Sequence, residues 1–140
     1  MIGISAKAEY AVRAVLHLTL HAGMENPVQL SEISRLQKIP RDFLIQVMSA
    51  LIKNGIVLGR RGAQGGYVLR TTPSSIFLKD VISAIDGPLS KFRCGDVSFK
   101  NCLGAHLCSF RPIWETITFE LTKSLQELNF EQISQSARKT

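Results

Sequence analysis

Residues 41–70 have the sequence RDFLIQVMSALIKNGIVLGRRGAQGGYVLR, in which a helical pattern is followed by a hairpin pattern. The first part holds apolar residues at the i, i+3, i+4, i+7 spacing of a buried helix face, namely Leu44, Val47, Met48 and Leu51. Asn54-Gly55 is typical of a helix end, because glycine readily adopts the left-handed conformation found there. Two apolar runs, 56–60 and 67–70, then flank a glycine-rich segment, which predicts a two-stranded hairpin.

Two further helices are predicted upstream of this stretch. Apolar spacing indicates one helix over residues 6–22 and a short helix from Leu30 to the turn at Ile39-Pro40. Helix, short helix, tight turn, helix and hairpin follow the order of a winged helix-turn-helix. The predicted fold is therefore mainly α with a two-stranded β-wing. In this motif the second helix of the pair enters the DNA major groove, and the hairpin tip contacts the backbone or the minor groove.

The face of the 41–53 helix opposite its apolar stripe carries candidate DNA-contacting residues, which are Arg41, Asp42, Gln46, Ser49 and Lys53. Gln46 can bond adenine through both ends of its amide, and Arg41 can pair with guanine or with phosphate. Ile45 could contact a thymine methyl group or be a packing residue. At the hairpin tip we add Arg60, Arg61 and Gln64, since arginine supplies charge and the neighbouring glycines let a phosphate approach the backbone.

The charge distribution agrees with this assignment. The chain has 140 residues and a net charge of +6. Residues 1–70 hold nine Lys/Arg and four acidic residues, whereas residues 71–140 hold eight and seven. The N-terminal half is thus expected to bind a polyanion. A composition that is 45% hydrophobic excludes intrinsic disorder, and no apolar run is long enough to span a membrane. We expect a cytoplasmic protein without a secretion signal.

Downstream of the hairpin, apolar spacing predicts a helix that begins near Leu78 and ends at Gly87-Pro88. Pro112 is well placed to begin a last long helix. This helix carries an apolar stripe suited to a partner helix, made of Trp114, Ile117, Leu121, Leu125 and Leu128. The predicted organisation is a DNA-binding domain with its linker helix over 1–88, a loop over 89–111, a dimerisation helix and end segment over 112–133, and a polar, frayed tail over 134–140.

All three cysteines, Cys94, Cys102 and Cys108, fall within the 89–111 loop. An odd number excludes a closed disulfide framework, and the spacing differs from that of a CxxC zinc site. Three thiolates on one loop can hold an iron–sulfur cluster with a fourth ligand from elsewhere, and His106 is the nearest imidazole. Zinc binding, buried thiols and redox-reactive thiols remain alternatives. His17 and His21, four residues apart, are either a metal pair or ordinary helix-surface or helix-end residues.

Several segments resemble the Rrf family of bacterial regulators. Residues 60–69, RRGAQGGYVL, look like the RGxxGGYxL wing of that family, and ISAKAEYAVR at 4–13 is similar to the start of its members. IPRDFL at 39–44 resembles the start of the family's recognition helix, and VISAIDGPL at 81–89 resembles its linker helix. The resemblance covers about residues 3–133.

The resemblance implies a homodimeric, winged-helix transcription factor of the bacterial cytoplasm, usually a repressor, whose long C-terminal helix crosses that of its partner. In sensing members, cysteines that correspond to Cys94, Cys102 and Cys108 hold a 2Fe–2S or 4Fe–4S cluster. IscR-like members have a histidine ligand where this chain has Arg111. NsrR-like members use an acidic residue of the other subunit, and Glu9 stands at that place. Glu9 in trans and His106 are thus the candidate fourth ligands, and 4Fe–4S is favoured over 2Fe–2S.

The expected function is regulation of transcription by a DNA-binding dimer. The dimer would bind a pseudo-palindromic operator, and the state of its cluster would alter the spacing of the two recognition helices and so the affinity. A CymR-like repressor without a cluster, gated by thiol oxidation or by a protein partner, is the alternative, and the GPLS segment at 87–90 fits that branch. An enzyme is not expected, because no nucleophile–base pair is apparent and the histidines form no acid–base set.

Overall fold

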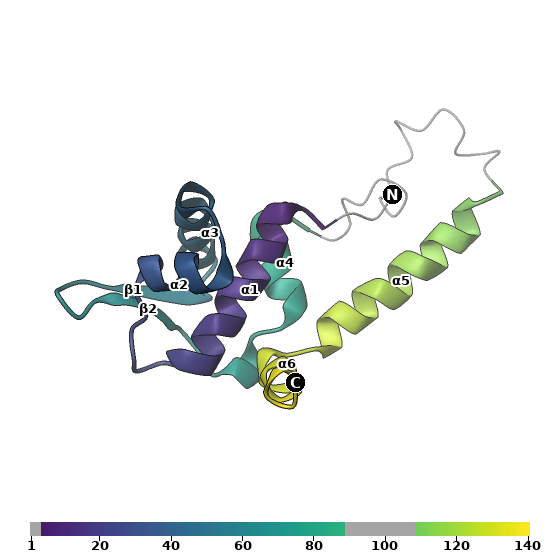
Figure 1. Cartoon of the computed structure of the whole chain (residues 1–140). Coiled ribbons are helices and arrows are strands. Elements are labelled where there is room, and N and C mark those ends of the chain that lie inside the picture. Colours follow the sequence, from purple (N-terminus) through teal and green to yellow (C-terminus); the bar gives the residue numbers. More distant parts are fainter. Residues whose placement is uncertain (1–3, 89–108) are drawn as a thin grey trace.

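The structure is a computed structural model that describes residues 4–88 and 109–140, without the side chains of Arg111 and Trp114 (Figure 1). Its elements are α1 (Ala6–His21), α2 (Leu30–Gln37), α3 (Arg41–Lys53), β1 (Val57–Arg60), β2 (Gly66–Leu69), the 3₁₀ turn η1 (Pro73–Ser75), α4 (Leu78–Asp86), α5 (Arg111–Glu127) and α6 (Phe130–Arg138). The mainly α fold with a two-stranded wing is confirmed. None of the described helices is long and apolar enough to cross a membrane.

Helix α1 runs through the centre of the body and packs against α2, α3, α4 and α6 (Figure 1). Its buried face is rich in small residues, with Ala8, Ala11 and Ala14 fully buried. Small side chains let neighbouring helices approach closely, so one helix can contact several others at once. Ser5 caps this helix, because its hydroxyl oxygen accepts a hydrogen bond of 3.1 Å from the Ala8 N–H. The helix-turn-helix pair, α2 and α3, therefore packs against a capped central helix.

Helices α2 and α3 are joined by a tight turn. Lys38 ends α2 in the left-handed conformation, with φ of 52°, and Ile39 is buried directly after it. Pro40 then precedes α3, where proline cannot extend the preceding helix. The predicted apolar stripe of α3 is confirmed, since Leu44, Val47, Met48 and Leu51 are all at most 1% exposed. The apolar spacing that predicts α2 comes from Leu30, Ile33 and Leu36, of which Ile33 is buried whereas Leu36 is 49% exposed.

The wing is an antiparallel pair of strands in which Val57 lies opposite Leu69 and Arg60 opposite Gly66. Gly55, with φ of 73°, makes the predicted left-handed turn between α3 and β1. A third segment joins the wing, because Val28 exchanges two backbone hydrogen bonds of 3.0 and 2.8 Å with Tyr67. The wing is therefore fastened at its base to the loop between α1 and α2.

The C-terminal part differs from the single helix that the sequence predicted. Helix α5 extends away from the body in Figure 1 and ends at Glu127, and a second helix, α6, packs beneath α1 and η1. Asn129 and Gln132 cap α6 reciprocally, each side chain accepting a hydrogen bond from the other's backbone N–H at 2.9 and 3.1 Å. Phe130 is fully buried and Ser134 is 4% exposed. The prediction of a frayed tail over 134–140 was therefore wrong as far as Arg138.

Candidate nucleic-acid interface

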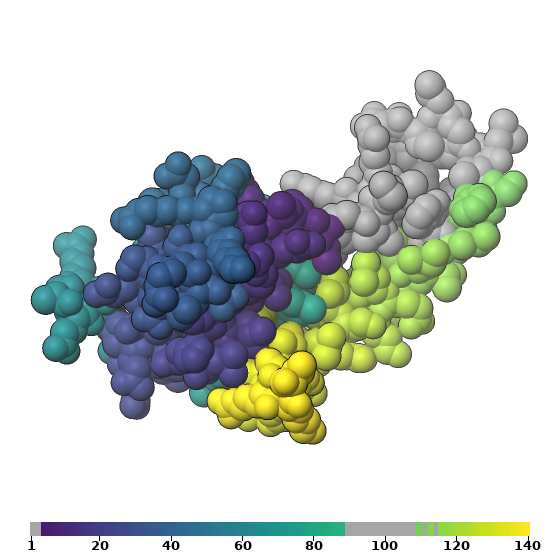
Figure 2. Space-filling model, in the orientation of Figure 1, coloured from purple at the N-terminus to yellow at the C-terminus, as the bar shows by residue number. Residues whose placement is uncertain are grey.

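The outer face of α3 is polar and open. All five residues predicted to contact DNA from this helix are exposed, namely Arg41, Asp42, Gln46, Ser49 and Lys53. Ile45 is 48% exposed beside them, so it is not a core residue of the described chain. Figure 2 shows α3 and the wing on the side of the body away from the free end of α5. Helix α3 and the wing thus lie on the same side of the body.

Helix α1 also contributes to this surface, which sequence reasoning missed. The Lys7 ammonium donates a hydrogen bond of 2.7 Å to Gln46 Oε1 and lies 5.7 Å from the centroid of the Phe43 ring. That ring contacts Tyr10, with 6.1 Å between centroids. Periodicity alone could not find Lys7, because it lies on the exposed side of the first turn of α1 and gives no apolar signal.

The two arginines of the wing have different surroundings. The Arg60 guanidinium donates hydrogen bonds of 2.9 and 3.2 Å to the carbonyl oxygens of Met24 and Glu25 in the loop between α1 and α2. Arg60 therefore braces the base of the wing. Arg61 and Gln64 lie beyond β1, at the exposed tip. Of the two cations predicted to meet DNA, Arg61 is the one placed at the tip.

Two of the wing glycines are required by contacts inside the chain. A Cβ at Gly65 would lie 2.3 Å from the Arg60 carbonyl oxygen, and a Cβ at Gly66 would lie 2.5 Å from the Val28 carbonyl oxygen. The sequence suggested that these glycines let a phosphate approach the backbone. The structure gives a different reason for Gly65 and Gly66, which is close packing of the wing backbone on itself and on the Val28 loop.

His17 is buried between α1 and α2, so its interpretation as a surface residue was wrong. The ring is 2% exposed, and Nδ1 lies 3.1 Å from Gln37 Nε2. Nε2 lies 3.7 Å from the Glu32 carboxylate, beyond hydrogen-bond distance. Burial, with a smaller contribution from His21, lowers the pKa of His17. Within 4–88 and 109–140, no three His, Cys, Asp or Glu side chains form a group that could hold a metal ion.

The predicted cluster ligands Cys94, Cys102 and Cys108, and the alternative ligand His106, lie outside the described residues. Glu9 is described and is exposed on the first turn of α1. The start of that helix is tied to the end of α4, because the Asp86 carboxylate accepts hydrogen bonds from the backbone N–H of Ser5, at 3.0 Å, and from its hydroxyl. Glu9 therefore lies on the helix end that is bonded to the last turn before the cysteine-bearing segment.

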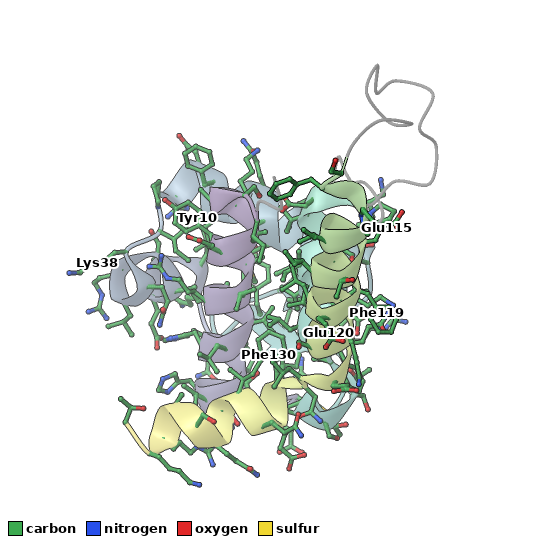
Figure 3. The ribbon with its side chains drawn as sticks, turned by 90° about the vertical axis from the view of Figure 1, so that its right-hand side faces the viewer. Tyr10, Lys38, Glu115, Phe119, Glu120 and Phe130 are labelled. Atoms are coloured by element: carbon green, nitrogen blue, oxygen red, sulfur yellow. The ribbon has the colours of Figure 1, made fainter. Side chains whose placement is uncertain are left out.

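Part of the apolar stripe predicted on the long helix packs against the same chain, and part of it is exposed. Leu125 is 5% exposed and packs with Leu121 against Ala8 and Ile82 of the same chain. Ile117 is 45% exposed and Leu128 is 42% exposed, at the end of the helix. Ile113 is also exposed on α5, and so is Phe119, which is labelled in Figure 3. The exposed apolar residues of α5 thus lie on two faces, because Ile113 and Ile117 are four residues apart on one face and Phe119 lies nearly opposite Ile117.

Comparison with known proteins agrees with this architecture. The family model described as Rrf2, iron-dependent transcriptional regulator, matches residues 4–136. The chain is 35% identical over 130 residues to the HTH-type transcriptional regulator IscR of Xenorhabdus nematophila. The aligned region is 93% of this chain and 77% of the relative. The IscR of Photorhabdus laumondii is likewise 35% identical over the same coverage.

Solved structures agree in fold. The global cysteine regulator CymR of B. subtilis superposes with a TM-score of 0.80 and 28% identity, covering 97% of this chain and 98% of CymR. The IscR of T. potens gives a TM-score of 0.74 and 29% identity, covering 96% and 88% of the two chains. These relatives are transcriptional regulators and not enzymes, as the sequence predicted. The match to the family model spans nearly the whole chain, and the chain therefore belongs to the Rrf2 family of transcriptional regulators.

Proposed function

We propose that this DNA-binding regulator of the IscR type acts as a homodimer and represses transcription, with an operator affinity that depends on an iron–sulfur cluster. One observation carries the DNA-binding part. Helix α3, on which Arg41 and Gln46 are exposed, lies on the same side of the body as the wing, whose exposed tip carries Arg61. A recognition helix and a wing on one side can contact the major groove and the adjacent backbone of the same duplex. The proposal includes a cytoplasmic location, since operator DNA lies there.

The dimer part rests on α5. This helix contacts its own body mainly through α4, and it exposes Ile113 and Ile117, which lie four residues apart on one face. Exposed apolar side chains on one helix favour a second apolar surface. The corresponding helix of a second copy provides one, and a two-fold dimer matches a pseudo-palindromic operator whose half-sites lie about 10 base pairs apart.

The cluster part rests on the donor set. Cys94, Cys102 and Cys108 supply three soft thiolates within one short segment, and iron–sulfur clusters are bound by such thiolates. Glu9 of the partner subunit or His106 would complete the ligands, and a 4Fe–4S cluster is preferred to 2Fe–2S. A bound cluster would supply redox chemistry and a site at which iron loss or nitric oxide changes the local charge. The names of the IscR relatives support this assignment without fixing the cluster type.

Control of affinity would use the contacts that flank the cysteine segment. Ser5 joins the start of α1 to Asp86 at the end of α4, and α1 packs directly on α3. A change in the cysteine segment can therefore reach the recognition helix through two packed helices. A coupling of about 1–3 kcal/mol would change operator affinity between several-fold and hundred-fold.

The test begins with anaerobic purification and counts of iron and sulfide per chain. A high-affinity duplex is then selected from a random pool, and its affinity is measured by fluorescence anisotropy for the cluster-loaded protein, the apoprotein and a Cys94→Ala/Cys102→Ala/Cys108→Ala variant. We expect visible absorbance that the variant lacks, and an affinity that differs between loaded and apo forms. Equal affinities in all three forms would contradict cluster control and leave DNA binding intact.

A second candidate is a repressor without a cluster, gated by thiol oxidation or by a protein partner. The observation that favours it is the likeness to CymR, which covers 97% of this chain. Protein that is free of iron after anaerobic purification, and that resists reconstitution with iron and sulfide, would support this candidate. Affinity that changes on thiol oxidation would then identify the cysteines as the switch.

A further inference from the structure

We propose that Lys7 of α1 is a specificity-determining positioning residue, which fixes the side-chain amide of Gln46 so that the recognition helix favours guanine over adenine at the base that Gln46 meets. The inference rests on the proposed DNA-binding role of α3. It assigns part of the base preference to a residue outside the helix-turn-helix pair. Helix α1 lies directly beside α3, so the contact is built into the core packing (Figure 1).

Two groups contact the Lys7 side chain, and a third supports one of them. Its ammonium donates a hydrogen bond of 2.7 Å to Gln46 Oε1, at the short end of the range for such bonds. The same nitrogen lies 5.7 Å from the centroid of the Phe43 ring, within reach of a cation–π interaction. Phe43 precedes Gln46 by three residues, so the two side chains are neighbours on the α3 surface. Tyr10 supports the Phe43 ring from α1.

This contact determines which end of the amide faces outward. A free glutamine can rotate its amide, and it can then offer an acceptor and a donor together, which is the pairing that adenine N6 and N7 require. Lys7 carries three N–H groups and no acceptor. With Oε1 turned to Lys7, the pair presents the Gln46 Nε2 amide and the remaining lysine N–H groups to the groove. The exposed surface of the pair is then rich in donors.

Base edges differ in how they match such a surface. Guanine presents two acceptors, N7 and O6, in the major groove, whereas adenine presents one acceptor and one donor. A pair of donors therefore suits guanine and leaves the adenine amino group without a matched acceptor. The simple expectation from the sequence, that Gln46 selects adenine, changes once the position of Lys7 is known.

The alternative role for Lys7 is a phosphate contact, which has a different signature. Loss of a phosphate contact weakens binding to all sequences about equally and lowers the salt dependence by about one ion. Lys53 provides the matched control. It is an exposed lysine on α3 seven residues after Gln46, about two helical turns away.

The experiment measures binding of the full-length protein to four selected duplexes that differ only at the base pair whose preference is lost in Gln46→Ala. Affinities are obtained by fluorescence anisotropy over a range of salt concentrations. The variants are Lys7→Met, which keeps the aliphatic stem, Lys7→Arg, Gln46→Ala, the Lys7→Met/Gln46→Ala double variant, and Lys53→Met. Circular dichroism melting checks that each variant is folded.

We expect Lys7→Met to reduce the ratio of guanine to adenine affinity at this base pair by about fivefold or more, the lower end of what one paired base contact contributes. Preferences at other positions should stay unchanged, Lys7→Arg should retain the ratio, and Lys7→Met should add nothing to Gln46→Ala. An equal loss on all four duplexes with a smaller salt slope, as for Lys53→Met, would overturn the proposal. So would a specificity change that persists without Gln46.

A measurement without DNA gives an independent check. NMR relaxation of the Gln46 Nε2 group in the free protein should report a more mobile amide in Lys7→Met than in the unaltered protein. Equal mobility would overturn the proposal as well. Failure of the unaltered protein to select any sequence from the random pool is a separate result, because it would overturn the DNA-binding function itself.

Discussion

Ser5 and Asp86, 81 residues apart in the chain, are joined by two hydrogen bonds from Ser5 to one carboxylate. Ser5 is also the N-cap of α1, and Asp86 is the last residue of α4. One contact therefore stabilises the start of the central helix and fixes the point from which the chain enters the cysteine segment.

Replacement of Ser5 by alanine removes the helix cap and one of the bonds to Asp86. We expect the free energy of unfolding to fall by about 1 kcal/mol, in the range measured for N-cap substitutions. Urea denaturation followed by circular dichroism measures this change. Ser136→Ala is the matched control, because Ser136 lies exposed within α6 and its side chain does not cap a helix. Equal stabilities of the two variants would contradict the capping role.

The two wing arginines should respond differently to replacement by methionine. Arg61→Met should weaken DNA binding and reduce the salt slope by about one ion, because it removes a cation from the wing tip. Arg60→Met should lower the melting temperature, because it removes the bonds to the Met24 and Glu25 carbonyl oxygens. Anisotropy titrations at several salt concentrations and thermal melting separate the two effects. If Arg60→Met instead weakened DNA binding and Arg61→Met lowered the melting temperature, Arg60 would be the residue that contacts DNA.

The buried His17 predicts an acid-sensitive fold. Burial lowers its pKa in the folded protein below the value of about 6.5 expected in the unfolded chain. The unfolded chain therefore binds more protons below that pH, so stability is full above pH of about 6.5 and is lost as the pH falls toward the folded-state pKa. The groups that face the ring are Gln37 and Glu32 of α2 and His21 of α1.

Urea denaturation between pH 5 and pH 8 would measure this dependence. His17→Leu should flatten the acid side of the profile, whereas His21→Gln should keep most of it, because burial is the largest cause of the shift. The slope that one histidine contributes cannot exceed about 1.4 kcal/mol per pH unit. An unchanged acid profile in His17→Leu would assign the sensitivity to another group.

Two substitutions on α5 should separate dimer formation from folding. Ile117→Asp places a charge on the exposed apolar surface, so we expect loss of the dimer in sedimentation velocity with the melting transition of the body retained. Leu125→Ala removes a side chain that packs against Ala8 and Ile82 of the same chain, and should cost about 2–4 kcal/mol of stability. A dimer that survives Ile117→Asp would place the subunit interface elsewhere.

Much of the fold could be predicted because local signals and burial agree. The four apolar residues of α3 are all buried, and the Asn54-Gly55 helix end and the Gly87 helix end are found where the sequence put them. Helix α6 was missed although its signal was present. Asn129 with Gln132 three residues later is a capping box, and the polar composition that follows concealed it.

The site was harder to predict, since side-chain partners depend on tertiary packing. The exposure of Arg41, Gln46 and Lys53 follows from helical geometry once the apolar stripe is known. The bonds of Arg60 to the α1–α2 loop join residues 35 and 36 positions apart, the bond of Lys7 to Gln46 joins residues 39 positions apart, and no local pattern encodes them. Contacts of this kind become visible only when the helices are packed.

The attachment of the wing to the loop before α2 limits how the wing can be exchanged between relatives. The Val28 bridge to Tyr67 and the Arg60 bonds to Met24 and Glu25 have one partner in each segment. The partner groups in residues 24–28 are all backbone atoms, so a foreign hairpin at residues 57–69 would keep these contacts only with an arginine at 60 and a glycine at 66. Residues 61–64 at the wing tip can therefore be exchanged between relatives to alter DNA preference, whereas Arg60 and Gly66 must be kept.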